Sequence, residues 1–115
     1  MSIPQRSVGG VTVLDLSPDV MTDVSRDLFG LTIESLFSNG CKGLVLNLAS
    51  LSWLNSGGIG LLVSAHRAAG NYGARIALAG ANARILEVLK VMGMEQLLTS
   101  FAGESEAVDS LQAAD

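Results

Sequence analysis

The chain has 115 residues, of which 49% are apolar and 16% charged, and its formal net charge is −4. This length fits one domain, residues 1–115, and this composition excludes an intrinsically disordered chain. The seven Lys and Arg residues are scattered, so the chain offers no clustered basic face and we expect no nucleic-acid partner. One cysteine, Cys41, excludes an internal disulfide, and with a single histidine, His66, we expect no metal site and no cofactor.

The apolar segments are too short to cross a membrane. Charged or polar residues interrupt each of them before it reaches the roughly 18 apolar residues that a membrane-spanning helix needs. Residues 1–6 lack the apolar core of a signal peptide. We therefore expect a cytoplasmic protein without membrane insertion.

The N-terminal part of the sequence predicts a β-hairpin. Residues 2–8 are weakly strand-like, residues 11–16 are strongly so, and the pair Gly9 and Gly10 between them is a turn signal. The first strand of this hairpin is expected at an edge of the sheet, where Pro4 is tolerated.

A helix is predicted next, beginning at Thr22 or Asp23 and ending at about Asn39 and Gly40. Its apolar arc is wider than one contact with a sheet requires. The surplus packs against another helix or forms a docking or dimer surface, and we favour the first interpretation. The arc consists of Val24, Leu28, Phe29, Leu31, Ile33, Leu36 and Phe37.

The most informative stretch runs from residue 43 to residue 60. Residues 44–48 form a near-continuous apolar run, which is typical of a strand covered on both faces. After a loop, apolar residues recur at i, i+3, i+4 and i+7, so a helix begins near Ser56. The residues with this spacing are Ile59, Leu62, Val63 and His66.

Two interpretations of Ser56 follow from local chemistry. The first turn of a helix offers unpaired backbone N–H groups and the positive end of the helix dipole, which favour a serine hydroxyl and tolerate a phosphate on it. Gly57 and Gly58 leave this serine open to a partner. Alternatively, Ser56 is the N-cap of the helix and nothing more. Local chemistry alone favours the N-cap.

The rest of the chain alternates strands and helices. The second helix ends near residues 70–73, a strand covers residues 74–79, and Asn82 caps a third helix that stops at Gly93. A short strand at 97–101 and a last helix from residue 104 to about 113 complete the order β-β-α-β-α-β-α-β-α. This order predicts an α/β fold with a mixed, mostly parallel sheet of about five strands and about four helices.

No arrangement of reactive residues suggests an enzyme. The sequence lacks Gly-x-Ser-x-Gly, Walker and His-Glu-x-x-His patterns. Ser56 has no evident base, because His66 lies ten residues further along, about 15 Å up a straight helix. We therefore expect a binding protein.

The strand, the loop and the Asn-Ser-Gly-Gly-Ile-Gly run together resemble the signature of the STAS domain, as found in bacterial anti-sigma factor antagonists. Members of that family show an apolar strand, a variable loop and then Asp-Ser-Ser/Thr/Ala-Gly-Leu/Ile-Gly. Ser56 falls on the phosphorylated serine of this motif, Asn55 on the aspartate and Gly57 on the variable small residue. The resemblance covers nearly the whole chain and implies a STAS-like single domain.

The resemblance implies a partner switch. Unmodified, the domain would bind an anti-sigma factor with serine kinase activity; phosphorylated on Ser56, it would release this partner, and a serine phosphatase would reset it. The domain itself would be a monomer or a weak homodimer. The partner surface is expected around the serine and along the second helix, and consists of Trp53, Leu54, Asn55, Ser56, Gly57, Gly58, Ser64 and Arg67. Trp53 is either half-buried over the sheet or an interface anchor.

The sequence departs from the family pattern in two places. Asn55 keeps the shape of the aspartate but not its charge, and residues 16–20 lack the Leu-x-Gly-x-Leu-Asp that commonly follows the second strand. The first departure keeps a second hypothesis open. In it the chain is a non-switching STAS subunit of a sensory or lipid-transport complex, or a small-ligand-binding module.

Overall fold

A computed structural model describes residues 3–18, 21 and 26–112. Within these residues the chain forms one five-stranded sheet and four helices in the predicted order. The elements are β1 (Gln5–Val8), β2 (Val11–Asp15), α1 (Arg26–Ser38), β3 (Gly43–Asn47), α2 (Ser56–Asn71), β4 (Arg75–Ala79), α3 (Ala83–Val91), β5 (Ser100–Phe101) and α4 (Glu104–Gln112).

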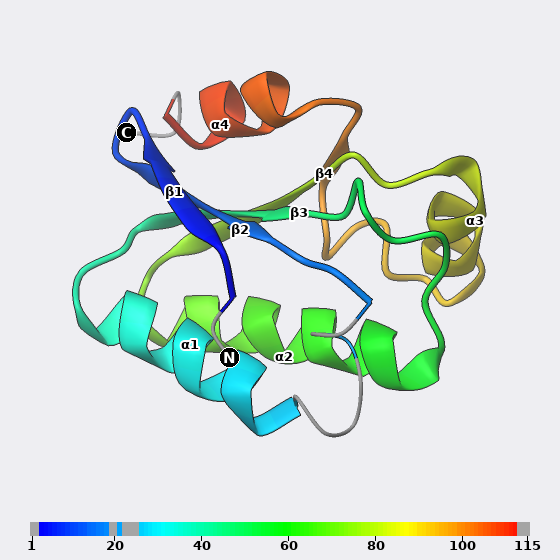
Figure 1. Cartoon of the computed structure of the whole chain (residues 1–115), viewed down its shortest axis with the longest axis horizontal. Coiled ribbons are helices and arrows are strands. Elements are labelled where there is room, and N and C mark those ends of the chain that lie inside the picture. The colour runs from blue at the N-terminus through cyan, green and yellow to red at the C-terminus, as the bar shows by residue number, and fades with distance from the viewer. Residues whose placement is uncertain (1–2, 19–20, 22–25, 113–115) are drawn as a thin grey trace.

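The sheet is mixed, as predicted. Its strand order is β1-β2-β3-β4-β5; β1 is antiparallel to β2, and the other neighbours are parallel. Figure 1 shows α1 and α2 side by side on one face of the sheet and α4 on the other, with α3 beyond the end at which β3 and β4 finish. The crossovers through the helices make the parallel pairs possible.

The central strand β3 has a core on each side. Leu44, Leu46 and Leu48 belong to the cluster beneath α1 and α2, whereas Val45 belongs to the cluster beneath α4. All four side chains are fully buried, because successive residues of a strand point to opposite faces of the sheet. The near-continuous apolar run in the sequence therefore reflects a strand that is covered on both faces.

The N-terminal hairpin is fastened to α4 by an arginine. The Arg6 guanidinium on β1 donates hydrogen bonds of 2.7 Å to Asp15 Oδ1 and of 2.6 and 2.7 Å to the Glu104 carboxylate. Gln112, at the other end of α4, donates a 2.7 Å bond to the Gly9 carbonyl in the turn. The edge strand and the last helix are thus held together by polar contacts at both ends of α4.

Two boundaries differ from the prediction, and one lies outside the described residues. The strand predicted at 97–101 is reduced to β5, because the N–H groups of Leu97 and Leu98 both donate to the Met94 carbonyl and form a turn. Leu98 is buried by that turn, so its apolar character reflects packing and not pairing in the sheet. The predicted N-cap of the first helix, Thr22 or Asp23, and Val24 lie outside the described residues.

The wide apolar arc of α1 is mostly core, as we favoured from the sequence. Phe29, Ile33 and Phe37 are buried against the sheet and α2, and Leu28 and Leu36 pack against the same cluster. Leu31 is the exception, because 70% of its side chain is exposed.

We predict that Gly80→Ala destabilises the protein. Gly80 has a φ of +73°, and an added Cβ would lie 3.1 Å from Ala49 Cβ and 3.2 Å from Ala49 N. The left-handed backbone alone costs an alanine about 1–2 kcal/mol. We expect a lower free energy of unfolding by about 2 kcal/mol in urea titrations. The matched control is Gly70→Ala in α2, where an added Cβ meets open space and should raise stability slightly. Equal stability of the two variants would contradict this account.

We also predict acid sensitivity from Asp15. The hydrogen bonds from Arg6 lower the pKa of this carboxyl, partial burial opposes them, and a bond from Asn47 lowers the pKa further. The unfolded chain therefore binds this proton at higher pH than the folded chain. The resulting stability is complete above the unfolded pKa, near 3.8, and is lost as the pH falls through the folded value. Thermal unfolding between pH 6 and pH 2 should show a smaller loss for Asp15→Asn than for the wild type. Parallel curves would contradict this expectation.

Candidate functional site

The candidate site is the junction between β3 and α2. The chain leaves β3 at the carboxyl end of the parallel strands, crosses a loop of residues 48–55 and enters α2 at Ser56. In open α/β sheets this edge is where partners and ligands are bound. The buried strand fixes where the loop begins, and the buried Ile59 and Leu62 fix the face that α2 turns inward.

Asn55 is the N-cap of α2, which corrects the interpretation that Ser56 is the cap. Asn55 has an extended backbone, with φ −87° and ψ −179°, and its Oδ1 accepts a 2.8 Å hydrogen bond from the Gly58 N–H. Its carbonyl accepts the Ile59 N–H at 3.0 Å. Asparagine and serine are comparably good caps, so local chemistry does not decide between adjacent positions. The helix begins one residue earlier than that interpretation assumed.

Ser56 is therefore the first residue of the helix, and its side chain is exposed. Among the described residues, no hydrogen bond uses its hydroxyl, because the capping bond is made by Asn55. The free first-turn N–H groups and the helix dipole favour negative charge at this position. The geometry leaves the hydroxyl open to chemical modification and to contact with a partner.

A second asparagine holds the loop that leads to the serine. Asn82 Oδ1 accepts the Ile85 N–H at 2.9 Å and caps α3, as the sequence predicts. Its Nδ2 also donates to the carbonyls of Leu51 and Ser52, at 3.4 and 2.9 Å. The loop before Ser56 is thus tied to the start of α3, a role that the local capping pattern does not reveal.

The predicted partner residues differ in accessibility. Asn55, Ser56, Ser64 and Arg67 are exposed and Gly57 is partly exposed, whereas Leu54 is 5% exposed and Gly58 is buried. An added Cβ at Gly58 would meet Leu54 Cδ2 at 2.9 Å, so these two residues pack on each other. We therefore leave them out of the contact surface and keep them as its support.

Trp53 has 53% of its side chain exposed. It lies in the loop beside a small hollow of about 210 Å³ that Pro18, Met21 and Leu51 also line. This exposure is high for a tryptophan in a chain of this size and agrees better with the anchor interpretation than with burial over the sheet.

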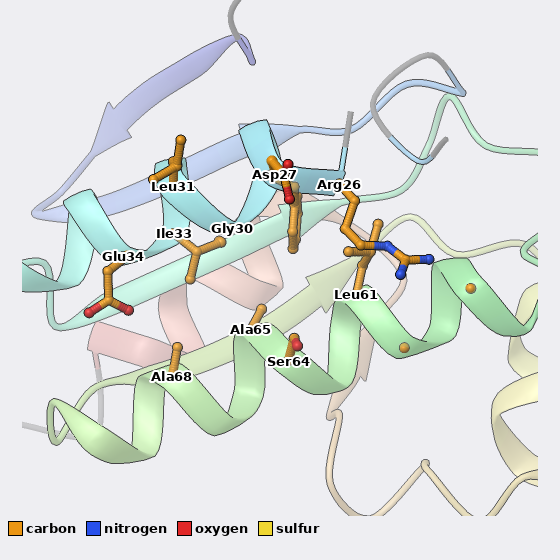
Figure 2. A pocket seen from close by; sticks show the side chains of 13 residues that line it. Arg26, Asp27, Gly30, Leu31, Ile33, Glu34, Leu61, Ser64, Ala65 and Ala68 are labelled. Atoms are coloured by element: carbon orange, nitrogen blue, oxygen red, sulfur yellow. The ribbon is translucent and has the colours of Figure 1, made fainter. Parts of the chain in front are cut away.

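Gly57 and Ser64 lie together in a larger cavity of about 770 Å³ between α1 and α2 (Figure 2). Arg26 and Glu34, from α1, border the same cavity. The sequence prediction missed this feature, although Gly60, Ser64 and Ala68 recur at every fourth residue of α2 and form a row of small side chains on one helix face. Arg67 and Trp53 do not line this cavity.

The described residues hold no cluster of three or more His, Cys, Asp or Glu side chains suited to a metal ion. None of the helices in the described part of the chain is long and apolar enough to cross a membrane. Ser56 begins α2 and the partly buried His66 lies almost three turns further along it. The site is arranged for recognition through an exposed hydroxyl.

We predict that the cap and the serine have separable effects on stability. Asn55→Ala should lower the free energy of unfolding by about 1 kcal/mol, because it leaves the Gly58 N–H without its acceptor. Asn55→Asp keeps the acceptor and adds a favourable negative charge, so stability should be retained. Ser56→Ala should be neutral within about 0.5 kcal/mol. If Ser56→Ala costs more than Asn55→Ala in urea unfolding, the cap assignment is wrong.

Comparisons with known proteins agree with this architecture. The family model described as "Mlab, STAS domain" matches residues 4–99. A comparison with curated proteins gave no significant match. Among solved structures, the Thermotoga maritima protein TM1081 has a TM-score of 0.80 at 19% identity, over 96% of this chain and 94% of that chain. RsbS of Moorella thermoacetica has a TM-score of 0.83 at 19% identity, over 97% of this chain and 96% of that chain.

The anti-sigma factor antagonist SpoIIAA is similar in both of its solved forms. The unphosphorylated form has a TM-score of 0.79 at 19% identity, over 97% of each chain. The phosphorylated form, from Bacillus, has a TM-score of 0.70 at 19% identity, over 95% of this chain and 98% of that chain. At these identities the solved structures establish the fold, and the family model covers most of the sequence. The chain belongs to the STAS domain family.

Proposed function

We propose that this STAS domain is an anti-sigma factor antagonist that works by a partner switch. With Ser56 unmodified it binds an anti-sigma factor that has serine kinase activity, and with Ser56 phosphorylated it releases this partner. The observation that carries the proposal is the exposed Ser56 hydroxyl at the first position of α2, with the cap supplied by Asn55. The proposed contact surface consists of Trp53, Asn55, Ser56, Gly57, Ser64 and Arg67.

The physical basis of the switch is local charge. Phosphorylation adds about −1.5 to −2 charge and three acceptor oxygens. The start of α2 accommodates this charge through its N–H groups and dipole, so the fold of the domain is retained. A partner surface fitted to a neutral hydroxyl must instead desolvate a dianion without a counter-ion, which is costly. The modification therefore acts on the interface and not on the stability of the domain.

The same proposal fixes the class of the protein. It is a non-enzymatic, cytoplasmic binding domain within residues 1–115, and a serine phosphatase returns it to the binding state. Support comes from the fold shared with SpoIIAA, for which structures of both an unphosphorylated and a phosphorylated form exist. The scattered basic residues support a protein partner and not a nucleic acid.

Asn55 favours a second candidate function. The family motif has an aspartate at this position, whereas the amide of Asn55 is neutral and is occupied with capping α2. A domain that needs no phosphotransfer can lose that carboxylate without cost. In this alternative the chain is a non-switching STAS subunit of a sensory or lipid-transport complex, or a module that binds a small ligand.

We predict that Ser56→Asp abolishes binding without unfolding the domain. The probe is the kinase-type anti-sigma factor of the native host, titrated calorimetrically with the domain. Ser56→Asp should weaken binding by about 100-fold, as expected for an unpaired charge buried in an interface, and Ser56→Ala should bind like the wild type. The matched control is Ser105→Asp, an exposed serine in the first turn of α4 on the opposite face of the sheet.

Phosphorylation is tested separately by mass spectrometry after incubation with the same anti-sigma factor and ATP. One phosphate should appear in the fragment of residues 48–67 of the wild type, and none in Ser56→Ala. If no phosphate is found and Ser56→Asp binds as tightly as the wild type, the switch is excluded. The non-switching subunit is then the better assignment.

A further inference from the structure

The cavity between α1 and α2 is a trough with an unusual pattern of charge on one rim. Its volume is about 770 Å³, and its α1 rim carries Arg26, Gly30 and Glu34. These residues are four positions apart and therefore form one ridge along the helix. Figure 2 shows the Arg26 guanidinium reaching toward the N-terminal end of α2 and Glu34 lying at the other end of the trough.

The middle of the trough is open on both rims. An added Cβ at Gly30 of α1 or at Gly60 of α2 would meet no heavy atom within 4 Å. The α2 rim continues with Ser64 and Ala68, which keep the row of side chains low. Small residues at this spacing let another helix approach closely.

Leu31 lies beside this opening and is 70% exposed. It is the side chain of the α1 arc that the core of the domain does not cover. An exposed leucine next to a trough of small residues is suited to insertion into a matching trough.

We propose that the trough is the interface of a homodimer in which α1 of one copy lies antiparallel to α1 of a second copy. The ridge reads positive, open, negative from Arg26 to Glu34, and an identical ridge running the other way reads negative, open, positive. A two-fold axis near Gly30 therefore places Arg26 of each copy opposite Glu34 of the other. Such an isologous contact makes each charge pair twice.

The pattern favours a second copy over an unrelated occupant, because the charges complement each other only when the same ridge is reversed. Arginine has five N–H donors, so a contact with the second copy leaves donors for bonds within its own chain. The contact spans about three helical turns, roughly 20 Å, and is small for a protein interface. We therefore expect dimerisation to be weak and to depend on concentration.

The dimer has a consequence for partner binding. Gly57 and Ser64 line the trough and also belong to the surface proposed for the anti-sigma factor. Self-association and partner binding would then exclude each other. The dimer itself stands without the proposed switch, since its argument uses only α1 and the trough.

Charge reversal tests the dimer by sedimentation equilibrium of the full chain at low ionic strength. Arg26→Glu and Glu34→Arg should each raise the dimer dissociation constant by at least about tenfold, because each replaces two attractive pairs with two repulsive ones. The double variant should restore the wild-type constant. Mixing the two single variants should produce a 1:1 heterodimer, since a ridge with two negative charges then faces a ridge with two positive charges.

Three variants control for effects outside the interface. Arg84→Glu and Glu87→Arg reverse the charge of exposed residues on α3 and should leave the dissociation constant unchanged. Tyr72→Phe removes the hydrogen bond from the Tyr72 hydroxyl to Glu34 without changing its charge, and should also leave it unchanged. Circular dichroism melting curves establish that each variant is folded.

Several outcomes would overturn the dimer. A wild-type protein that stays monomeric up to about 1 mM, or single variants that dimerise like the wild type, would exclude it. A monomer whose affinity for the anti-sigma factor falls with Arg26→Glu would assign the trough to that partner instead. Because these outcomes do not involve Ser56, they are distinguishable from a failure of the proposed switch.

Discussion

The burial of β3 on both faces is the constraint on which the rest of the structure depends. Leu44 and Leu46 point toward α1 and α2, and Val45 points toward α4, so the strand has one acceptable register. A shift by one residue would place leucines where the α4 side offers space lined by valine and alanine. Because the strand cannot slip, the place where the chain leaves the sheet is fixed, and with it the loop that carries Ser56.

Two asparagines convert that fixed exit into a presentation site. Asn55 caps α2 and Asn82 caps α3, and the amide of Asn82 also holds the loop between them. An asparagine can accept and donate at the same time, whereas a serine in either place would have fewer contacts to give. The polar bonds that this edge of the sheet needs are therefore made by other residues. Ser56 keeps an exposed hydroxyl on a rigid support.

One helix serves both inferred interactions. The first residue of α2 is the proposed switch, and the face that runs from Gly57 through Ser64 forms one wall of the trough. A phosphate on Ser56 acts through charge at the helix end, whereas a second copy acts by occupying shape along the helix. The two events use neighbouring surfaces of one element, so a change in either is expected to alter which partner the domain can accept.

The sequence by itself determined the order of the elements and the position of the motif, because strand alternation, helix periodicity and the stops at Gly40 and Gly93 are local properties. It did not decide which of Asn55 and Ser56 caps α2, since both side chains can make that bond and only the packing of α2 sets its first residue. It also could not show that Leu54 is buried or that a trough exists. Those features depend on how α1 lies across α2 and how the loop folds under it, and such distances between segments are set by the tertiary structure.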